Sequence, residues 1–167
     1  MRKDQDRTQR MRRAGRLVLS LFLPLVAGAL GGLATSQGVT DWYPTLLKPP
    51  FNPPSWVFGP VWTLLYLLMG YALYLIWDLG LRNPKVRWAM YLFGLQLLFN
   101  ILWSFLFFGA RAPGWAFLEI LVLWILITQT LVAFYRLRKW AGLLLAPYLA
   151  WVTFAGVLNF AIWTLNR

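Results

Sequence analysis

Amide and aromatic side chains recur at four-residue intervals within three apolar stretches of the sequence. The three series are Trp62, Tyr66 and Gly70; Gln96, Asn100 and Ser104, with Trp103 beside them; and Pro147, Trp151, Ala155, Asn159 and Trp163. An α-helix turns by about 100° per residue, so neighbours in each series share one helix face. Such faces could line a cavity for a flat, largely apolar ligand with a few polar ends. They could equally join neighbouring helices through hydrogen bonds.

The sequence lacks the residues that most conventional catalysis requires. It contains no cysteine and no histidine, which excludes a disulfide, a thiolate nucleophile, a zinc finger and a Ser–His pair. No acid–base dyad or nucleotide-binding motif is visible either. We therefore predict no metal site and no required cofactor. The enzymatic chemistry that remains is radical or photochemical work by indole side chains.

Five long apolar segments supply the helices that would carry these faces. Of the 167 residues, 60% are hydrophobic and 13% are charged, compared with about 25% charged in a typical soluble domain. Crossing a bilayer core takes about 20 helical residues. The runs that reach this length are 17–35, 57–79, 88–109, 115–135 and 141–165. We predict an all-α integral membrane protein, a five-transmembrane-helix bundle over residues 17–167 that follows a basic extension over residues 1–16.

The distribution of positive charge predicts the orientation of the bundle. Thirteen Lys and Arg residues lie before the first run or in the connections 80–87 and 136–140, whereas Lys48, Arg111 and Arg167 lie on the other side. The positive-inside rule then places the N-terminus inside and the C-terminus outside, and we expect the membrane to be a bacterial cytoplasmic membrane. The net charge of +11 thus reflects membrane topology, and no nucleic-acid partner is expected. Residues 1–16 are expected to be mobile or to lie along anionic headgroups.

The connection 36–56 is long enough to fold over one end of the bundle. The stretch "WYPTLLKPPFNPPSWVFGPVW", from Trp42 to Trp62, holds six of the ten prolines of the chain. Proline fixes φ and removes a backbone donor, which lowers the entropy lost in holding one shape. The stretch therefore reads either as a stiff aromatic lid or as an ordinary interfacial loop whose tryptophans lie among the headgroups.

Three stretches of the sequence resemble the signature segments of the tryptophan-rich sensory protein family, TspO/MBR. They read "WYPTLLKPPFNPPSWVFGPVWTLLYLLMGYALYLIW", "QLLFNILWS" and "PYLAWVTFAGVLNFAIWTLN", and the resemblance extends over nearly all of 17–166. It implies five transmembrane helices around a pocket that opens under the first loop. It also implies binding of porphyrins such as protoporphyrin and haem, and, in some members, of sterols and benzodiazepine-site ligands. Members commonly form homodimers.

Carried over to this sequence, the resemblance implies pocket residues on the lid and on three helices. These are Trp42, Tyr43, Trp56, Asn100, Trp151 and Ala155. Together with the helix faces described above, the expected ligand-binding residues are Trp42, Tyr43, Trp56, Trp62, Tyr66, Gln96, Asn100, Trp103, Trp151, Ala155 and Asn159. The sterol motif of animal members needs a tyrosine where this chain has Phe160, so the resemblance does not extend to that motif.

The expected function is a membrane binding protein or sensor for porphyrins, active in tetrapyrrole handling or oxidative-stress signalling. One alternative is a light- and oxygen-dependent enzyme that degrades porphyrin through Trp56 and Trp151. Another is a transporter of tetrapyrroles or sterols. Binding is favoured because stacking needs only aromatic faces, whereas catalysis also needs an electron path and a protected intermediate.

Overall fold

The computed structural model describes residues 2–167, except for the side chains of residues 2–6, 8 and 37. Its helices are α1 (Arg2–Asp41), α2 (Ser55–Trp77), α3 (Pro84–Ser104), α4 (Pro113–Leu137), α5 (Lys139–Leu143) and α6 (Ala146–Leu165), with a short 3-10 turn η1 (Tyr43–Thr45) and a π-helical turn η2 (Phe105–Gly109). Within this part of the chain, five helical segments are long and apolar enough to cross a membrane, the fifth being α5 and α6 together. The predicted fold class is therefore confirmed.

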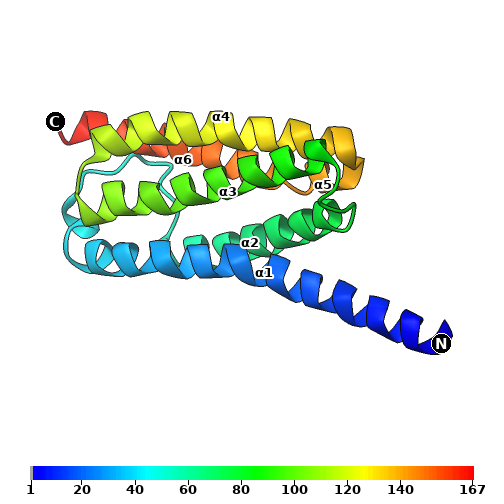
Figure 1. Ribbon diagram of the computed structural model, residues 1–167. Coiled ribbons are helices and arrows are strands. Elements are labelled where there is room, and N and C mark those ends of the chain that lie inside the picture. The colour runs from blue at the N-terminus through cyan, green and yellow to red at the C-terminus, as the bar shows by residue number, and fades with distance from the viewer. Residues whose placement is uncertain (1) are drawn as a thin grey trace.

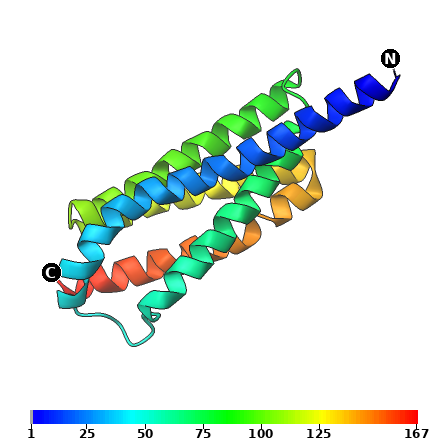
Figure 2. The ribbon, with the colours of Figure 1, turned by 90° about the horizontal axis from the view of Figure 1, so that it is seen from below.

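The long helices lie side by side and alternate in direction (Figure 1). Helix α1 packs on α2 and α3, α3 packs on α4, and α4 packs on α6. The two termini lie at opposite ends of the bundle, and the first turns of α1 project beyond it (Figures 1 and 2). This arrangement follows from an odd number of spans joined by short connections.

Helix α1 is longer at both ends than the sequence predicted. Residues 2–16, expected to be mobile or to follow the headgroups, continue α1 as regular helix; Met1 and several of the side chains involved lie outside the described residues. Arg13 and Arg16 approach the Asp78 carboxylate, with nitrogen–oxygen distances of 3.8 and 3.9 Å. These ion pairs connect the N-terminal part of α1 to the C-terminal end of α2.

The lid is correspondingly shorter than the predicted loop 36–56, because α1 ends at Asp41 and α2 begins at Ser55. Thr35 and Ser36 do not break the helix, since their hydroxyls donate to the carbonyls of Gly31 and Leu33 within it. The connector that remains, residues 42–54, begins with η1 and contains five prolines. We refer to residues 42–54 as the connector below.

The predicted fifth helix, 141–165, is interrupted. A turn at residues 144 and 145 separates α5 from α6, and Pro147 stands in the first turn of α6. Proline is favoured there because the first amides of a helix have no intrahelical acceptor. The α5 segment lies against the end of α4, and a Cβ atom at Gly142 would lie 2.5 Å from the Cβ of Tyr135. This close approach explains why a glycine stands at the crossing.

The bundle is filled at one end and hollow at the other. Large side chains such as Ile76, Phe93 and Phe134 pack the half nearer the N-terminus, where Phe93 and Phe134 stack with ring centroids 5.8 Å apart. At the middle of the bundle α1 comes close to α2 at two glycines. A Cβ at Gly70 would lie 2.7 Å from the Cα of Leu21, and a Cβ at Gly28 would overlap the ring of Tyr66. Towards the connector, small residues of α1 border a cavity.

Candidate functional site

A cavity of about 560 Å³ lies beneath the connector, between α1, α2, α3, η2 and α6. Ligand pockets in proteins commonly measure about 300–1,000 Å³. The residues that line it are Gly28, Gly31, Gly32, Thr35, Ser36, Val39, Thr40, Tyr43, Ser55, Phe58, Gly59, Trp62, Tyr66, Asn100, Trp103, Ser104, Phe107, Phe108, Trp151, Ala155, Leu158, Asn159 and Ile162. Eight of the eleven predicted ligand-binding residues are among them.

The floor of the cavity is a chain of hydrogen bonds centred on Asn100. The Tyr66 hydroxyl donates to Asn100 Oδ1 at 2.8 Å, and Asn100 Nδ2 donates to the Tyr148 hydroxyl at 3.0 Å. Tyr148 is only 1% exposed and lies behind the floor. The bonds connect α2, α3 and α6. Asn100 therefore serves both roles that the sequence left open, since it lines the cavity and also joins three helices.

The wall next to the floor has a second amide, Asn159, whose hydrogen-bonding groups are also engaged. Trp103 Nε1 donates to Asn159 Oδ1 at 3.0 Å, and Asn159 Nδ2 donates to the Pro113 carbonyl at 2.8 Å. The Trp103 ring stacks on Phe107 with centroids 5.1 Å apart. With its indole N–H bonded to Asn159, Trp103 presents a fixed aromatic surface to the cavity.

The opposite wall is formed by aromatic rings of α2 and α6. Trp62 stacks on Tyr66 with centroids 5.4 Å apart, and Trp151 meets Phe58 edge-to-face at 5.9 Å. Ring contacts of this kind hold each aromatic side chain in one orientation. The cavity thus has three indoles in its walls and a polar floor, an arrangement that suits a flat apolar ligand.

Tyr43 is the connector residue that borders the cavity. Its hydroxyl donates to Asn52 Oδ1 at 2.7 Å, and its ring packs against Phe108 with centroids 5.8 Å apart. Burial raises the pKa of Tyr43 above its ordinary value, and the hydrogen bond with Asn52 opposes that rise in part. The phenol therefore stays neutral. Lys48 Nζ lies 4.9 Å from the centroid of the Tyr43 ring, so the connector folds on itself around Tyr43.

Three predicted residues do not line the cavity: Trp42, Trp56 and Gln96. Trp56 is 75% exposed, because α2 turns Ser55, Gly59 and Trp62 towards the cavity and places the next residue about 100° around the helix. Trp42 lies behind the lining, edge-on to Phe107 at 5.6 Å. Gln96 lies one turn from Asn100 in the packed half, 1% exposed, and its amide atoms have no hydrogen-bond partner among the described residues.

Besides Ser55, Phe58, Gly59, Leu158 and Ile162, two groups of lining residues were missed in the sequence. The first is the face of α1 from Gly28 to Val39, whose small side chains leave room for a ligand; their spacing of three and four residues was the available signal. The second is the pair Phe107 and Phe108 in η2, where α3 widens into a π turn. Wide turns of this kind are frequent at functional sites, but an apolar run such as "FLFFG" carries no visible sign of one.

The structure assembles no group of three or more His, Cys, Asp or Glu side chains that could hold a metal ion within its described residues.

Comparisons with known proteins agree over almost the whole bundle. The profile of the TspO/MBR family matches residues 20–164. The chain is 44% identical over 150 residues to the tryptophan-rich protein TspO of Chlorobaculum tepidum, covering 90% of this chain and 95% of the relative. It is 40% identical over 147 residues to the translocator protein of Bos taurus, with 87% of each chain covered. It is 39% identical over 150 residues to the tryptophan-rich sensory protein of Cereibacter sphaeroides, covering 88% and 92%.

Proposed function

The chain belongs to the TspO/MBR family, and on that premise we propose that it is a membrane binding protein for porphyrins that acts in tetrapyrrole handling or oxidative-stress signalling. The observation that supports this most is the cavity, with Trp62, Trp103 and Trp151 in its walls and Asn100 in its floor. Indole faces attract a large aromatic macrocycle through dispersion and stacking. The polar floor provides a partner for one edge of the macrocycle.

The chemistry of the lining favours recognition of the macrocycle over recognition of its metal. The sequence has no histidine or cysteine, so metal-free protoporphyrin is as suitable a guest as haem. Lys48 on the connector is a candidate partner for a propionate group, because its ammonium group lies over Tyr43, a residue of the lining. Its side chain also donates to the Leu46 carbonyl at 3.1 Å, a bond that a stronger anionic acceptor could replace.

The direct test is a titration of the purified protein with protoporphyrin in the dark. Quenching of tryptophan fluorescence should saturate at one porphyrin per chain, because the walls contain three indoles within reach of the guest. Quenching that rises linearly without saturation would mean partition into the detergent or lipid. That outcome would contradict the proposal.

Light-dependent degradation of porphyrin is a second candidate function, and the indoles in the cavity wall favour it. Of the two tryptophans considered for this chemistry, Trp151 lines the cavity, whereas Trp56 lies outside it. The decisive variant is Trp151→Phe, since phenylalanine keeps an aromatic face but is far harder to oxidise than indole. An enzyme should retain much of its affinity in this variant and lose product formation under light and oxygen. A binder should show the same loss of porphyrin with either side chain.

Transport of tetrapyrroles or sterols and assembly as a homodimer are further expectations for a member of this family. Inverted repeats are a common sign of alternating-access transporters, and the five spans of this chain show no such symmetry in sequence. We therefore favour binding over transport as the function of this chain. Mass measurement in lipid nanodiscs would decide the oligomeric state.

We also predict that the N-terminus and the connection 78–83 face the cytoplasm of a bacterium while the connector faces outwards. Thirteen of the sixteen Lys and Arg residues are on the predicted inner side. Because the chain has no native cysteine, Leu47→Cys and Leu81→Cys each introduce a single exposed thiol. In intact cells a membrane-impermeant maleimide should label Leu47→Cys and spare Leu81→Cys, and both should react after permeabilisation. The reverse pattern would overturn the orientation.

A further inference from the structure

Asn166, the residue that follows α6, is hydrogen-bonded to the middle of the connector. The Leu47 backbone N–H donates to Asn166 Oδ1 at 2.9 Å, and Asn166 Nδ2 donates to the Leu47 carbonyl at 2.9 Å. These residues are 119 positions apart in the chain. A third bond, from Nδ2 to the Ile162 carbonyl at 2.8 Å, fixes the amide to the end of α6. The side chain therefore pairs with both backbone groups of one connector residue.

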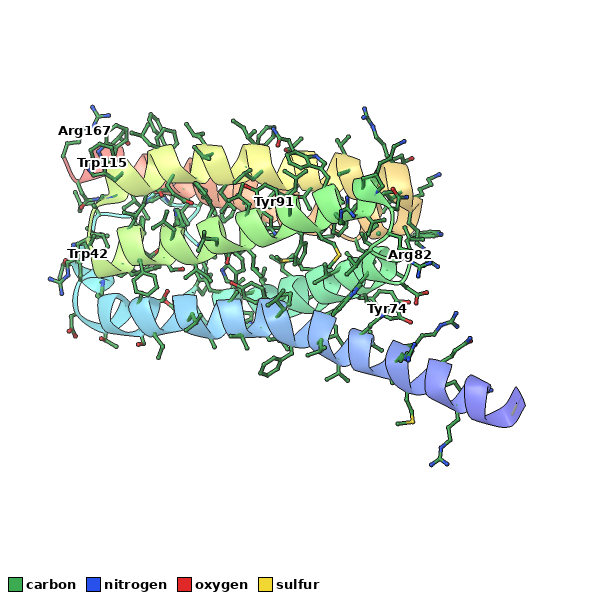
Figure 3. All side chains as sticks on the ribbon, in the orientation of Figure 1. Trp42, Tyr74, Arg82, Tyr91, Trp115 and Arg167 are labelled. Atoms are coloured by element: carbon green, nitrogen blue, oxygen red, sulfur yellow. The ribbon has the colours of Figure 1, made fainter. Side chains whose placement is uncertain are left out.

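This pairing lies next to the part of the connector that borders the cavity. Tyr43 and Leu46, which precede Leu47, pack in one apolar cluster with Leu158 and Ile162 of α6. Tyr43, Leu158 and Ile162 also line the cavity. Trp42 and Arg167 lie at the same end of the bundle, and Arg82 lies at the opposite end (Figure 3). From the end of α1, beside the C-terminus, the connector crosses this end of the bundle to reach α2 (Figure 2).

Other connector contacts are aromatic or lie within the connector itself. Beyond Leu47, Phe51 meets Phe154 edge-to-face with centroids 6.4 Å apart, and Tyr43 is bonded to Asn52 within the connector itself. Five prolines restrict the backbone between the two helices. A chain with so few free torsions moves largely as one body, so a small number of bonds at its middle can decide whether it is seated on α6.

We propose that Asn166 is a positioning residue for ligand exchange: it latches the connector over the cavity, and release of the Asn166–Leu47 pairing limits the rates at which a ligand enters and leaves. This inference rests on the proposed function, because a porphyrin is the ligand whose exchange it describes. The polar atoms of the latch are near solvent, so water can replace both bonds when the connector lifts. Rearrangements of this size occur on timescales of microseconds and longer.

The mechanism predicts a kinetic pattern that other roles would not produce. If a ligand passes only while the connector is lifted, the population of the lifted state multiplies both the association rate and the dissociation rate. Removal of the latch then raises both rates by the same factor and leaves the dissociation constant unchanged. A residue that contacts the ligand would change the dissociation constant instead. A residue that only stabilises the fold would lower the number of working sites without accelerating exchange.

The first experiment is stopped-flow mixing of protoporphyrin with wild type and with Asn166→Ala in nanodiscs, in the dark. Loss of the paired hydrogen bonds should accelerate association and dissociation by about tenfold each, which corresponds to about 1.4 kcal/mol. The dissociation constant should stay within about twofold on this account. Asn166→Asp keeps the acceptor for the Leu47 N–H and loses the donor, so its association and dissociation rates should lie between those of wild type and of Asn166→Ala.

The matched control is Thr164→Ala. Thr164 lies in the same last turn, but its hydroxyl donates to the Phe160 and Ala161 carbonyls of its own helix, at 3.0 and 2.9 Å. The Thr164→Ala variant should leave the association and dissociation rates unchanged. If Thr164→Ala accelerates exchange as much as Asn166→Ala, the effect comes from fraying of α6, and the latch is overturned.

Hydrogen exchange provides a readout that needs no porphyrin. The Leu47 amide, which Asn166 protects in the structure, should exchange about tenfold faster in Asn166→Ala. Faster amide exchange with unchanged porphyrin rates would overturn the gating role and leave the proposed function intact. Unchanged amide exchange would overturn the latch itself. Failure of wild type to bind porphyrin would overturn the proposed function, and the gating role with it, whatever the amide does.

Discussion

Replacement of Trp151 by alanine should lower the affinity for protoporphyrin by about fivefold to 150-fold, equivalent to about 1–3 kcal/mol. Trp151 lines the cavity, and its ring is held in place by Phe58 at 5.9 Å and Phe154 at 5.5 Å. Truncation to alanine removes one face of the binding site and frees those two neighbours to move. The measurement is the dark titration of fluorescence quenching, repeated on the variant.

The matched control for this prediction is Trp56→Ala, the same truncation at a tryptophan that lies outside the cavity and is 75% exposed. It should leave the affinity within about twofold of wild type, since the lost surface faces away from the site. Thermal unfolding in the presence and absence of porphyrin separates a loss of binding from a loss of folded protein. An equal loss of affinity in both variants would mean that the site lies where the connector meets α2 and not in this cavity.

The sequence alone predicted the fold class, because the relevant signal is long and simple. Runs of about 20 apolar residues predict transmembrane helices regardless of what they contact. Helix ends were less predictable. Ser36 and Thr40 were predicted to lie in the loop 36–56, yet they stay helical with their hydroxyls bonded to carbonyls one turn back. A serine or threonine hydroxyl inside a helix can donate its hydrogen bond to a backbone carbonyl in this way.

For the cavity, spacing along single helices was the most useful signal. It placed Tyr66, Asn100 and Asn159 on inward faces, and the structure brings all three to the cavity. Trp56, which the family resemblance implied as a pocket residue, lies outside the cavity, because a shift of one residue in a helix turns a side chain by about 100°. The register of α2 depends on how Pro54 and Ser55 begin the helix, and this depends on contacts that no local pattern records.

The latch shows a second limit. Asn166 is next to the last residue of the sequence, and Leu47 lies in a proline-rich stretch with no amide partner in view. Nothing in either segment indicates that they meet across 119 positions. The π turn η2 is similar, since it brings Phe107 and Phe108 to the cavity through backbone geometry alone. Contacts of this kind arise from the tertiary arrangement and need a structure to be found.

Replacement of Asn100 by leucine should lower the free energy of unfolding by about 2–4 kcal/mol, the largest loss of stability that we expect from a single change at the floor of the cavity. Leucine is close to asparagine in size and suits the apolar bundle, so the cost comes from the hydrogen bonds. Tyr66 and Tyr148 lose their partner at 2.8 and 3.0 Å, and Tyr148 is only 1% exposed, so its hydroxyl is left buried and unpaired. The measurement is unfolding in mixed micelles with increasing sodium dodecyl sulfate.

The test of this explanation is a rescue by further loss of polar groups. Tyr66→Phe and Tyr148→Phe each remove one hydroxyl, and the triple variant with Asn100→Leu leaves none of the three polar groups at the floor. Because an unpaired buried polar group costs more than a pair that is absent altogether, the triple variant should be more stable than Asn100→Leu alone by at least about 1 kcal/mol. If the triple variant is as unstable as Asn100→Leu or less stable, the loss of stability comes from the shape of leucine and not from the unpaired hydroxyls. In that case the requirement at position 100 is for the shape of asparagine between α2 and α6, and the hydrogen bonds of the floor contribute little to stability.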